Sequence, residues 1–286
     1  MITARTDVLG VIGYPIEHSL SPQIHERFAR AMNQDICYAA FRVVPERLGE
    51  AIAGAHSLGI KGLNVTIPHK QACLPFLSRA DETARRIGAV NTLVYEEEGY
   101  AGYNTDYIGI KMSLKAAGAE IRGKSVVIIG AGGTARAACV MTADNAPAEI
   151  VIANRTSDNA ELLAAGVKSF YNIPIRAVPL SELNNILHKD IVIQTTSVGL
   201  NEPPGKCPVD SESFFEEVSA ALDLIYSPWE TRFIQMARAK GVPAVNGFSA
   251  LVYQAAASFE LWRGLRLPPH YLDSVLEILA PMAKPV

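Results

Sequence analysis

Lys70 and Asp106 are the two ionisable residues in the first 110 positions whose placement best suits acid–base chemistry. Lys70 falls in the first turn of a helix expected near Pro68, where the helix dipole disfavours a cation, and such a local conflict indicates function. The alternative interpretations are an ordinary solvated lysine and a helix-capping aspartate. As a pair, Lys70 could take the proton of a substrate hydroxyl while Asp106 holds that hydroxyl and orients the lysine.

Neutral hydrogen-bonding side chains accompany this pair at the ends of predicted strands. Ser19 and Ser21 follow the first strand, Asn64 and Thr66 lie on one side of the third, and Asn91 lies in the next polar cluster. Ser21 alone could be a helix N-cap. Open α/β sheets bind ligands outside the carboxyl ends of their strands, so this set predicts a site for a small polyhydroxylated acid.

A glycine fingerprint follows the apolar run Ser125–Ile129. Gly130 permits a tight turn, Gly132 lets the backbone approach a pyrophosphate, and Ala135 allows close packing of helix and strand. The phosphates would lie at the helix N-terminus, where N–H groups and the dipole favour anions. The pattern predicts a dinucleotide site, with a glycine turn in an unrelated α/β fold as the alternative.

The residues after the next strand indicate which dinucleotide is bound. The strand Ile150–Ala153 ends in Asn154-Arg155-Thr156, and an arginine at this place suits the 2′-phosphate of NADP. Asp158 close by keeps NAD as the less favoured choice. A nicotinamide that accepts a hydride, with a lysine that accepts a proton, would oxidise a secondary alcohol.

Strand-like and helix-like runs alternate along the chain, which predicts an α/β protein with parallel sheets. Strands are expected at 8–12, 37–44, 62–66, 89–94, 100–103, 125–129, 150–153, 176–178, 191–195, 221–225 and 243–245. Helices are expected from 22, over 45–58, near 68, and over 105–117, 249–263 and 271–280, and between most of the later strands. We expect a mostly parallel substrate-binding domain at residues 1–110, completed by returning C-terminal helices at 247–286, and a Rossmann domain at 111–246.

Composition narrows the class of protein. A net charge of −3 leaves no basic excess for nucleic acid or membrane surfaces. The four scattered cysteines favour free thiols over disulfides or zinc, and no signal peptide or transmembrane run is visible, so a cytoplasmic protein is expected. His18, His25 and His69 lack the spacing of a metal site and are interpreted as locally hydrogen-bonded or surface residues.

Several motifs in one order resemble the shikimate dehydrogenase family nearly end to end. They are residues 13–22 (GYPIEHSLSP), 64–70 (NVTIPHK), 88–92 (GAVNT), 102–106 (GYNTD), 130–133 (GAGG), 154–156 (NRT), 195–199 (TTSVG), 223–226 (DLIY) and 247–254. The resemblance implies reduction of 3-dehydroshikimate with NADPH in aromatic amino-acid (chorismate) biosynthesis. It also implies a monomer or a homodimer.

The resemblance assigns roles residue by residue. It implies Lys70 and Asp106 as the catalytic pair. For the substrate pocket it implies Ser19, Ser21, Asn64, Thr66, Lys70, Asn91, Asp106, Tyr226 and Gln254. For the cofactor it implies Gly130, Ala131, Gly132, Gly133, Thr134, Ala135, Asn154, Arg155, Thr156, Thr196 and Gly247, and no metal is expected.

Three positions depart from the family pattern. Asn159 stands where a second basic residue is common, Ala250 replaces a methionine, and Gln194 replaces a smaller side chain. The near alternative is a quinate/shikimate dehydrogenase of broader substrate range, for which both NADP and NAD stay open as cofactors. A ligand sensor without turnover is the alternative from another class, and the presence of both Lys70 and Asp106 disfavours it.

Overall fold

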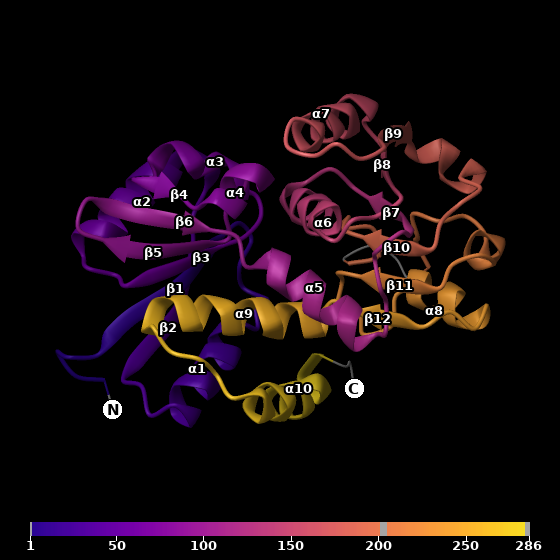
Figure 1. Ribbon diagram of the computed structural model, residues 1–286. Coiled ribbons are helices and arrows are strands. Elements are labelled where there is room, and N and C mark those ends of the chain that lie inside the picture. Colours follow the sequence, from indigo (N-terminus) through magenta and orange to yellow (C-terminus); the bar gives the residue numbers. More distant parts are fainter. Residues whose placement is uncertain (1, 201–204, 284–286) are drawn as a thin grey trace. The chain divides into compact units, whose positions relative to one another are not determined.

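The computed structural model describes residues 2–200 and 205–283, and their contacts divide into two compact units (Figure 1). The first unit comprises the chain up to Thr105 together with Val252–Ile278. The second comprises Asp106–Leu251 and the residues from Leu279 onward. Within the described residues, no helix is long and apolar enough to cross a membrane.

The first unit contains a six-stranded mixed sheet in the order β2-β1-β3-β5-β6-β4. Its strands are β1 (Asp7–Gly13), β2 (Ile36–Arg42), β3 (Gly62–Val65), β4 (Arg79–Ala80), β5 (Thr92–Glu96) and β6 (Gly99–Tyr103). The pairs β1–β2, β1–β3 and β4–β6 are parallel, and β5 is antiparallel to both β3 and β6. Strand order therefore reverses at the β1–β3 pair.

Helices cover both faces of this sheet (Figure 1). They include α1 (Ser21–Ala31), α2 (Leu48–Ser57), α3 (His69–Ala72), α4 (Glu82–Ile87) and α9 (Phe248–Arg263), with short 3₁₀ turns η1 (Pro45–Arg47) and η2 (Leu74–Phe76). Helix α10 (Pro269–Ala283) follows α9, and its residues from Leu279 group with the second unit. One face packs α2 and α4 on a core that includes Leu63, Val65 and Leu93. On the other face α1 meets α9, where the Phe28 and Phe259 rings lie 5.7 Å apart.

The second unit is a six-stranded parallel sheet in the order β12-β11-β10-β7-β8-β9. Its strands are β7 (Ser125–Ile129), β8 (Glu149–Asn154), β9 (Ile175–Pro179), β10 (Ile191–Gln194), β11 (Ala220–Asp223) and β12 (Ala244–Asn246). Read from β9, this is the doubly wound 3-2-1-4-5-6 order, with its switch point between β7 and β10. The expectation of a two-domain α/β protein with a Rossmann domain is confirmed.

The strands of this second sheet are buried between two layers of helices and 3₁₀ turns. The helices are α5 (Asp106–Ala116), α6 (Gly133–Asp144), α7 (Ser157–Lys168) and α8 (Arg232–Ala239), with 3₁₀ turns η3 (Leu180–Asn185) and η4 (Glu212–Phe215). Helix α6 contacts α5, α7 and the sheet, whereas α8 and η4 contact each other in the other layer. Because both faces are covered, the five residues of β7 are all buried.

Several elements differ from their predicted extents or were not predicted, among them β5, which begins at Thr92 where residue 89 was expected. Strand β11 ends at Asp223, short of the predicted residue 225, because the Asp223 carboxylate accepts a hydrogen bond from the Ile225 backbone N–H and turns the chain. Helix α3 has four residues, and a 3₁₀ turn containing Pro75 follows it at once. The two-residue strand β4 was not predicted, since so short a pairing leaves no pattern.

Candidate active site

The loops after β1 and β3 lie side by side at the switch point of the first sheet. The Thr66 N–H donates to Ile12 O at 3.0 Å, and the Tyr14 N–H donates to Ile67 O at 3.0 Å. A Cβ at Gly13 would lie 2.4 Å from Thr66 Cγ2, so only glycine permits this approach. The two loops that carry the predicted serines, Thr66 and Lys70 are thus joined at the position where open α/β sheets bind ligands.

The two serines after β1 differ in burial. Ser21 is the first residue of α1 and is buried, and its backbone N–H donates to Ser19 Oγ at 3.3 Å. Leu20 is the N-cap residue, so the capping alternative considered for Ser21 is wrong. Ser19 is half-buried, and its hydroxyl organises the turn into α1.

Lys70 and Asp106 each stand at the start of a helix. Lys70 is half-buried in α3, and its carbonyl oxygen accepts the Val90 N–H at 2.8 Å, which ties the lysine to the segment carrying Asn91. Asp106 is half-buried and begins α5. Asp106 is the first residue of the second unit, whereas Lys70 belongs to the first.

A buried polar cluster joins three of the predicted substrate residues. Asn91 Oδ1 accepts the Thr105 N–H at 2.7 Å, and Asn91 Nδ2 donates to Gln254 Oε1 at 3.3 Å. Asn64 Oδ1 accepts the Tyr38 hydroxyl at 2.7 Å, while Asn64 Nδ2 donates to Asn91 O at 3.1 Å. Asn64, Asn91 and Gln254 therefore share one network.

Sequence reasoning missed Ser258, which is fully buried in the same cluster on α9. Its hydroxyl lies 3.0 Å from Asn64 Nδ2 and 2.7 Å from Thr92 Oγ1. A signal was available, because Ser258 lies four positions after Gln254 on a predicted helix and such residues share a face.

The turn after β7 fits the phosphates of a dinucleotide. Gly130 has φ +117°, and a Cβ there would lie 2.4 Å from Thr195 Oγ1, so the turn requires glycine. At Gly132, the N-cap of α6, a Cβ would have no described atom within 4 Å. The helix begins with no capping bond from a described side chain, so its N–H groups face this space. Ala135 is fully buried, as close helix–strand packing requires.

The β8–α7 loop presents its basic side chain outward. Asn154 Nδ2 donates to Thr156 O at 2.9 Å and fixes the loop, while Arg155 and Thr156 are exposed. Asp158 is exposed in the first turn of α7. The Arg155 guanidinium could pair with a phosphate next to a ribose held at the end of β8.

Gln194, one of the departures from the family pattern, holds the loop after β10. Its Oε1 accepts the Thr196 N–H at 2.6 Å, and its Nε2 donates to Thr196 O and Val198 O at 3.2 and 3.3 Å. The side chain is fully buried. The longer amide thus fixes the backbone of Thr196, a predicted cofactor residue, across the switch point from Gly130.

A buried carboxyl group organises the segment that carries Tyr226. Asp223 accepts the Thr231 hydroxyl at 2.5 Å and the Ile225 N–H at 3.0 Å, and burial raises its pKa to about 6. Burial also raises the pKa of Tyr226, so its phenol stays protonated and can donate. A Cβ at Gly247 would lie 2.1 Å from Leu224 O, so glycine is required where β12 passes this segment.

The burial and hydrogen bonding of the three histidines agree with the sequence interpretation except at His25. His69 is buried, and its Nε2 lies 2.8 Å from Val43 O, whereas His18 is exposed. His25 is fully buried, and neither ring nitrogen has a hydrogen-bond partner among the described residues, so the interpretation of His25 as a hydrogen-bonded or surface residue is wrong. In the described part of the chain, no three His, Cys, Asp or Glu side chains are grouped to hold a metal ion.

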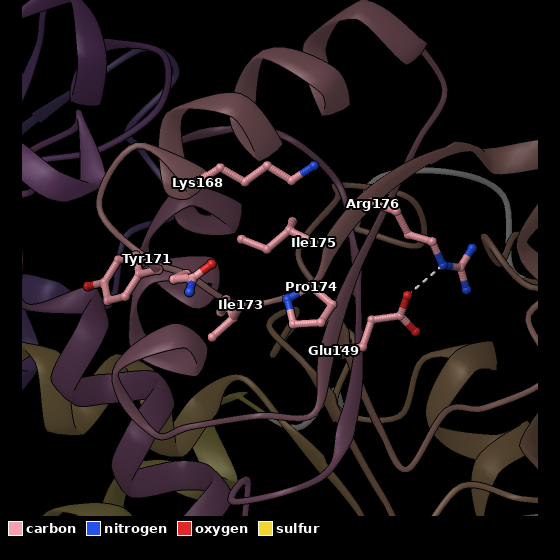
Figure 2. A pocket seen from close by; sticks show the side chains of 8 residues that line it. Glu149, Lys168, Tyr171, Ile173, Pro174, Ile175 and Arg176 are labelled. Atoms are coloured by element: carbon pink, nitrogen blue, oxygen red, sulfur yellow. Dashed lines mark hydrogen bonds and ion pairs between the residues drawn. The ribbon is translucent and has the colours of Figure 1, made fainter.

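An open hollow of about 590 Å³ lies elsewhere in the second unit (Figure 2). Its lining includes Lys168, Tyr171 and the ion pair between Arg176 and Glu149, whose atoms are 2.8 Å apart. Glu149 begins β8, so the hollow is at the amino ends of the strands. It contains none of the predicted site residues, and the glycine turn lies at the opposite edge of the sheet.

The strand order and the glycine turn define a dinucleotide-binding α/β protein that has a further α/β unit. Family profiles match the chain in three parts: "Shikimate dehydrogenase substrate binding domain" at residues 11–93, "Shikimate / quinate 5-dehydrogenase" at 112–201, and "Shikimate 5'-dehydrogenase C-terminal domain" at 247–276. The chain belongs to the shikimate dehydrogenase family.

Individual relatives match along nearly their whole length. A shikimate dehydrogenase (NADP(+)) of Caldanaerobacter subterraneus is 42% identical over 92% of this chain and 94% of its own. A crystal structure of a shikimate dehydrogenase in complex with NADP+ has 36% identity and a TM-score of 0.89, with 97% of each chain covered. A Thermus thermophilus enzyme in complex with NADP(H) and shikimate has 33% identity and a TM-score of 0.84, covering 97% of this chain and 100% of its own.

Proposed function

We propose that this chain catalyses the reversible NADPH-dependent reduction of 3-dehydroshikimate to shikimate in chorismate biosynthesis. The observation that carries the proposal is the polar cluster of the first unit, where Asn91 and Gln254, 163 positions apart, are hydrogen-bonded beside Asn64. An array of fixed amides and hydroxyls suits a ligand with several hydroxyl groups. Residues 1–110 with 247–286 would bind the substrate and 111–246 the cofactor.

The residues of the two loops at the β1–β3 switch point would recognise the substrate. The hydroxyls of Ser19, Ser21 and Thr66 can bind its carboxylate and hydroxyl oxygens. Gln254 Oε1 accepts from Asn91, which turns its Nε2 donors to the other side of the amide, where they would meet a substrate oxygen. The neutral phenol of Tyr226 would add a further donor.

NADP fits the second unit, and when bound it supplies the nicotinamide that exchanges a hydride with the substrate carbon. Gly130–Ala135 would hold the pyrophosphate, Asn154, Arg155 and Thr156 the phosphorylated ribose, and Thr196 and Gly247 the nicotinamide end. In the oxidising direction Lys70 Nζ accepts the proton of the substrate hydroxyl. The Asp106 carboxylate accepts a hydrogen bond from that hydroxyl and orients Lys70.

The proposal extends to the cellular compartment and the oligomeric state. We propose a cytoplasmic enzyme, which its four free cysteines suit. A monomer or a homodimer would serve, since one chain supplies every proposed site residue.

Initial rates with shikimate or quinate, each offered with NADP+ or NAD+, test this function. We expect turnover of shikimate with NADP+ to dominate. Lys70→Ala should lower kcat by about 10²–10⁴-fold with little change in KM, because proton transfer acts in the transition state. The exposed Lys115→Ala is the matched control and should keep kcat.

Two results would reject parts of the proposal. A Lys70→Ala enzyme with weakened KM and unchanged kcat would remove the proton-transfer role of Lys70. Comparable turnover of quinate, or a preference for NAD+, would assign the chain to the broader quinate/shikimate activity.

A further inference from the structure

Ser258 places a hydroxyl in the interior of the first unit. The residue is fully buried on α9, flanked by the equally buried Ala255 and Phe259. Burying a hydroxyl without hydrogen-bond partners destabilises the folded state, so its contacts must offset that cost. Four described polar atoms surround it: Asn64 Nδ2 at 3.0 Å, Thr92 Oγ1 at 2.7 Å, Thr105 Oγ1 at 3.0 Å and Gln254 O at 3.0 Å.

The proton count limits which bonds of this cluster can coexist. A serine hydroxyl has one proton and two lone pairs. Ser258 donates to Gln254 O, the carbonyl four residues earlier on α9, so its lone pairs accept from Asn64 Nδ2 and from one of the two neighbouring threonine hydroxyls. The other threonine hydroxyl then donates to Asn91 Oδ1, which lies 3.0 Å from Thr92 Oγ1 and 3.1 Å from Thr105 Oγ1.

This assignment decides which way the Asn64 amide points. An asparagine amide fits either way round, and its partners select the orientation. Ser258 and Asn91 O take the Nδ2 end, so Oδ1 faces the Tyr38 hydroxyl at 2.7 Å.

We propose that Ser258 is a positioning residue for substrate recognition. Its hydroxyl fixes the amide of Asn64, whose Nδ2 also donates to Asn91 O, and the Asn91 side chain in turn holds Gln254. Ser258 itself touches no substrate in this scheme. The inference rests on the proposed function, in which these three amide side chains bind shikimate.

Ser258→Ala removes the hydroxyl and leaves the Asn64 amide and one threonine hydroxyl to find other partners. We expect KM for shikimate to rise about tenfold, the effect of one lost hydrogen bond of ~1.4 kcal/mol, with KM for NADP+ and kcat within about twofold of the unsubstituted enzyme. A role in stability alone would not separate the two KM values.

Ser249→Ala is the matched control. Ser249 is on the same helix and its hydroxyl lies 2.8 Å from Ser113 Oγ, away from this cluster. Both variants lose one serine hydroxyl from α9, but only Ser258→Ala should raise KM for shikimate. Ser258→Cys, close in size and a weak hydrogen-bonding group, should repeat the effect if Ser258→Ala does not fold. Ser258→Thr keeps the hydroxyl and should restore KM.

The outcomes separate the two proposals. No shikimate turnover by the unsubstituted enzyme would reject the proposed function and this inference with it. Normal turnover by that enzyme, with KM for shikimate unchanged in the folded Ala and Cys variants or raised equally for both substrates, would overturn the role of Ser258 alone.

Discussion

His25 is a titratable residue enclosed in an aromatic cluster. Its ring stacks on Tyr38 at 4.3 Å and lies 5.2 Å from the Trp262 ring, and burial lowers its pKa to about 3. Burial also raises the pKa of Tyr38 well above its usual range, so Tyr38 supplies no charge to pair with His25. The imidazole is therefore neutral in the folded protein at any pH above about 3.

This burial makes stability depend on pH. Unfolded, His25 binds a proton below about pH 6.5, whereas the folded state binds it only below about pH 3. The contribution of His25 is therefore fully present above pH 6.5 and is lost progressively as pH falls toward 3. Between pH 8 and pH 5 the loss is about 2 kcal/mol in the free energy of unfolding.

His25→Phe keeps a ring in the stack and removes the titrating nitrogens, so it should abolish this loss. Urea unfolding at pH 8 and pH 5 measures it, with the unsubstituted protein compared at both values. His25→Gln, neutral but polar, should flatten the dependence in the same way. Curves of equal slope for all three proteins would contradict the neutral, buried state of His25.

At the residue scale, the sequence predicted the site residues that lie at strand ends or within family motifs. Asn64 and Asn91 were predicted from strand ends and Gln254 from the family motifs, and the structure brings all three into one network. Ser258 and His25 were missed or misjudged because their roles depend on which side chains surround them. That information comes from contacts between α9, α1 and the sheet, which no local pattern contains.

At the scale of elements, the β7–α6 turn contains two glycines that are required for different reasons. Gly130 has a backbone conformation that other residues rarely adopt, and a Cβ would meet Thr195. Gly132 has φ −81° and open space around it. The fold requires the first glycine, whereas the open space at the second suits the proposed cofactor role.

Gly130→Ala should therefore lower the free energy of unfolding by about 1–3 kcal/mol, through backbone strain and the contact with Thr195. Gly132→Ala should leave stability unchanged but raise KM for NADP+ about tenfold or more, because a methyl group would occupy the space of the pyrophosphate. Thermal unfolding without cofactor and KM measurements distinguish the two. Equal destabilisation by both substitutions would contradict this division.

Element prediction succeeded where apolar runs were long and failed where side chains end an element. Strand β7 and helix α9 were predicted within a residue of their observed bounds. The end of β11 was not, because it depends on the Asp223 carboxylate bonding to the Ile225 N–H. Such a turn is set by one side chain and leaves no periodic signal.

At the scale of the whole molecule, the two units differ in how the chain builds them. The second unit is drawn almost entirely from one continuous stretch, Asp106–Leu251. The first takes its last helical layer from Val252–Ile278, where the Trp262 indole donates to Leu93 O at 2.8 Å and Arg263 pairs with Asp7 at 2.6 Å. Even the glycine of β3 is fitted to this layer, because a Cβ at Gly62 would lie 2.2 Å from the Trp262 ring.

The first unit therefore begins to be synthesised before the stretch Asp106–Leu251 of the second unit but is completed after it. On the ribosome, residues 1–105 emerge before α9, so the face of their sheet that packs against α9 stays uncovered until that helix has been synthesised. We expect ribosome-bound chains that expose residues 1–251 to protect the second unit from protease and leave the first unit open to cleavage. Early protection of residues 1–105 in such chains would contradict this, and would mean that the first unit folds without the segment that closes it.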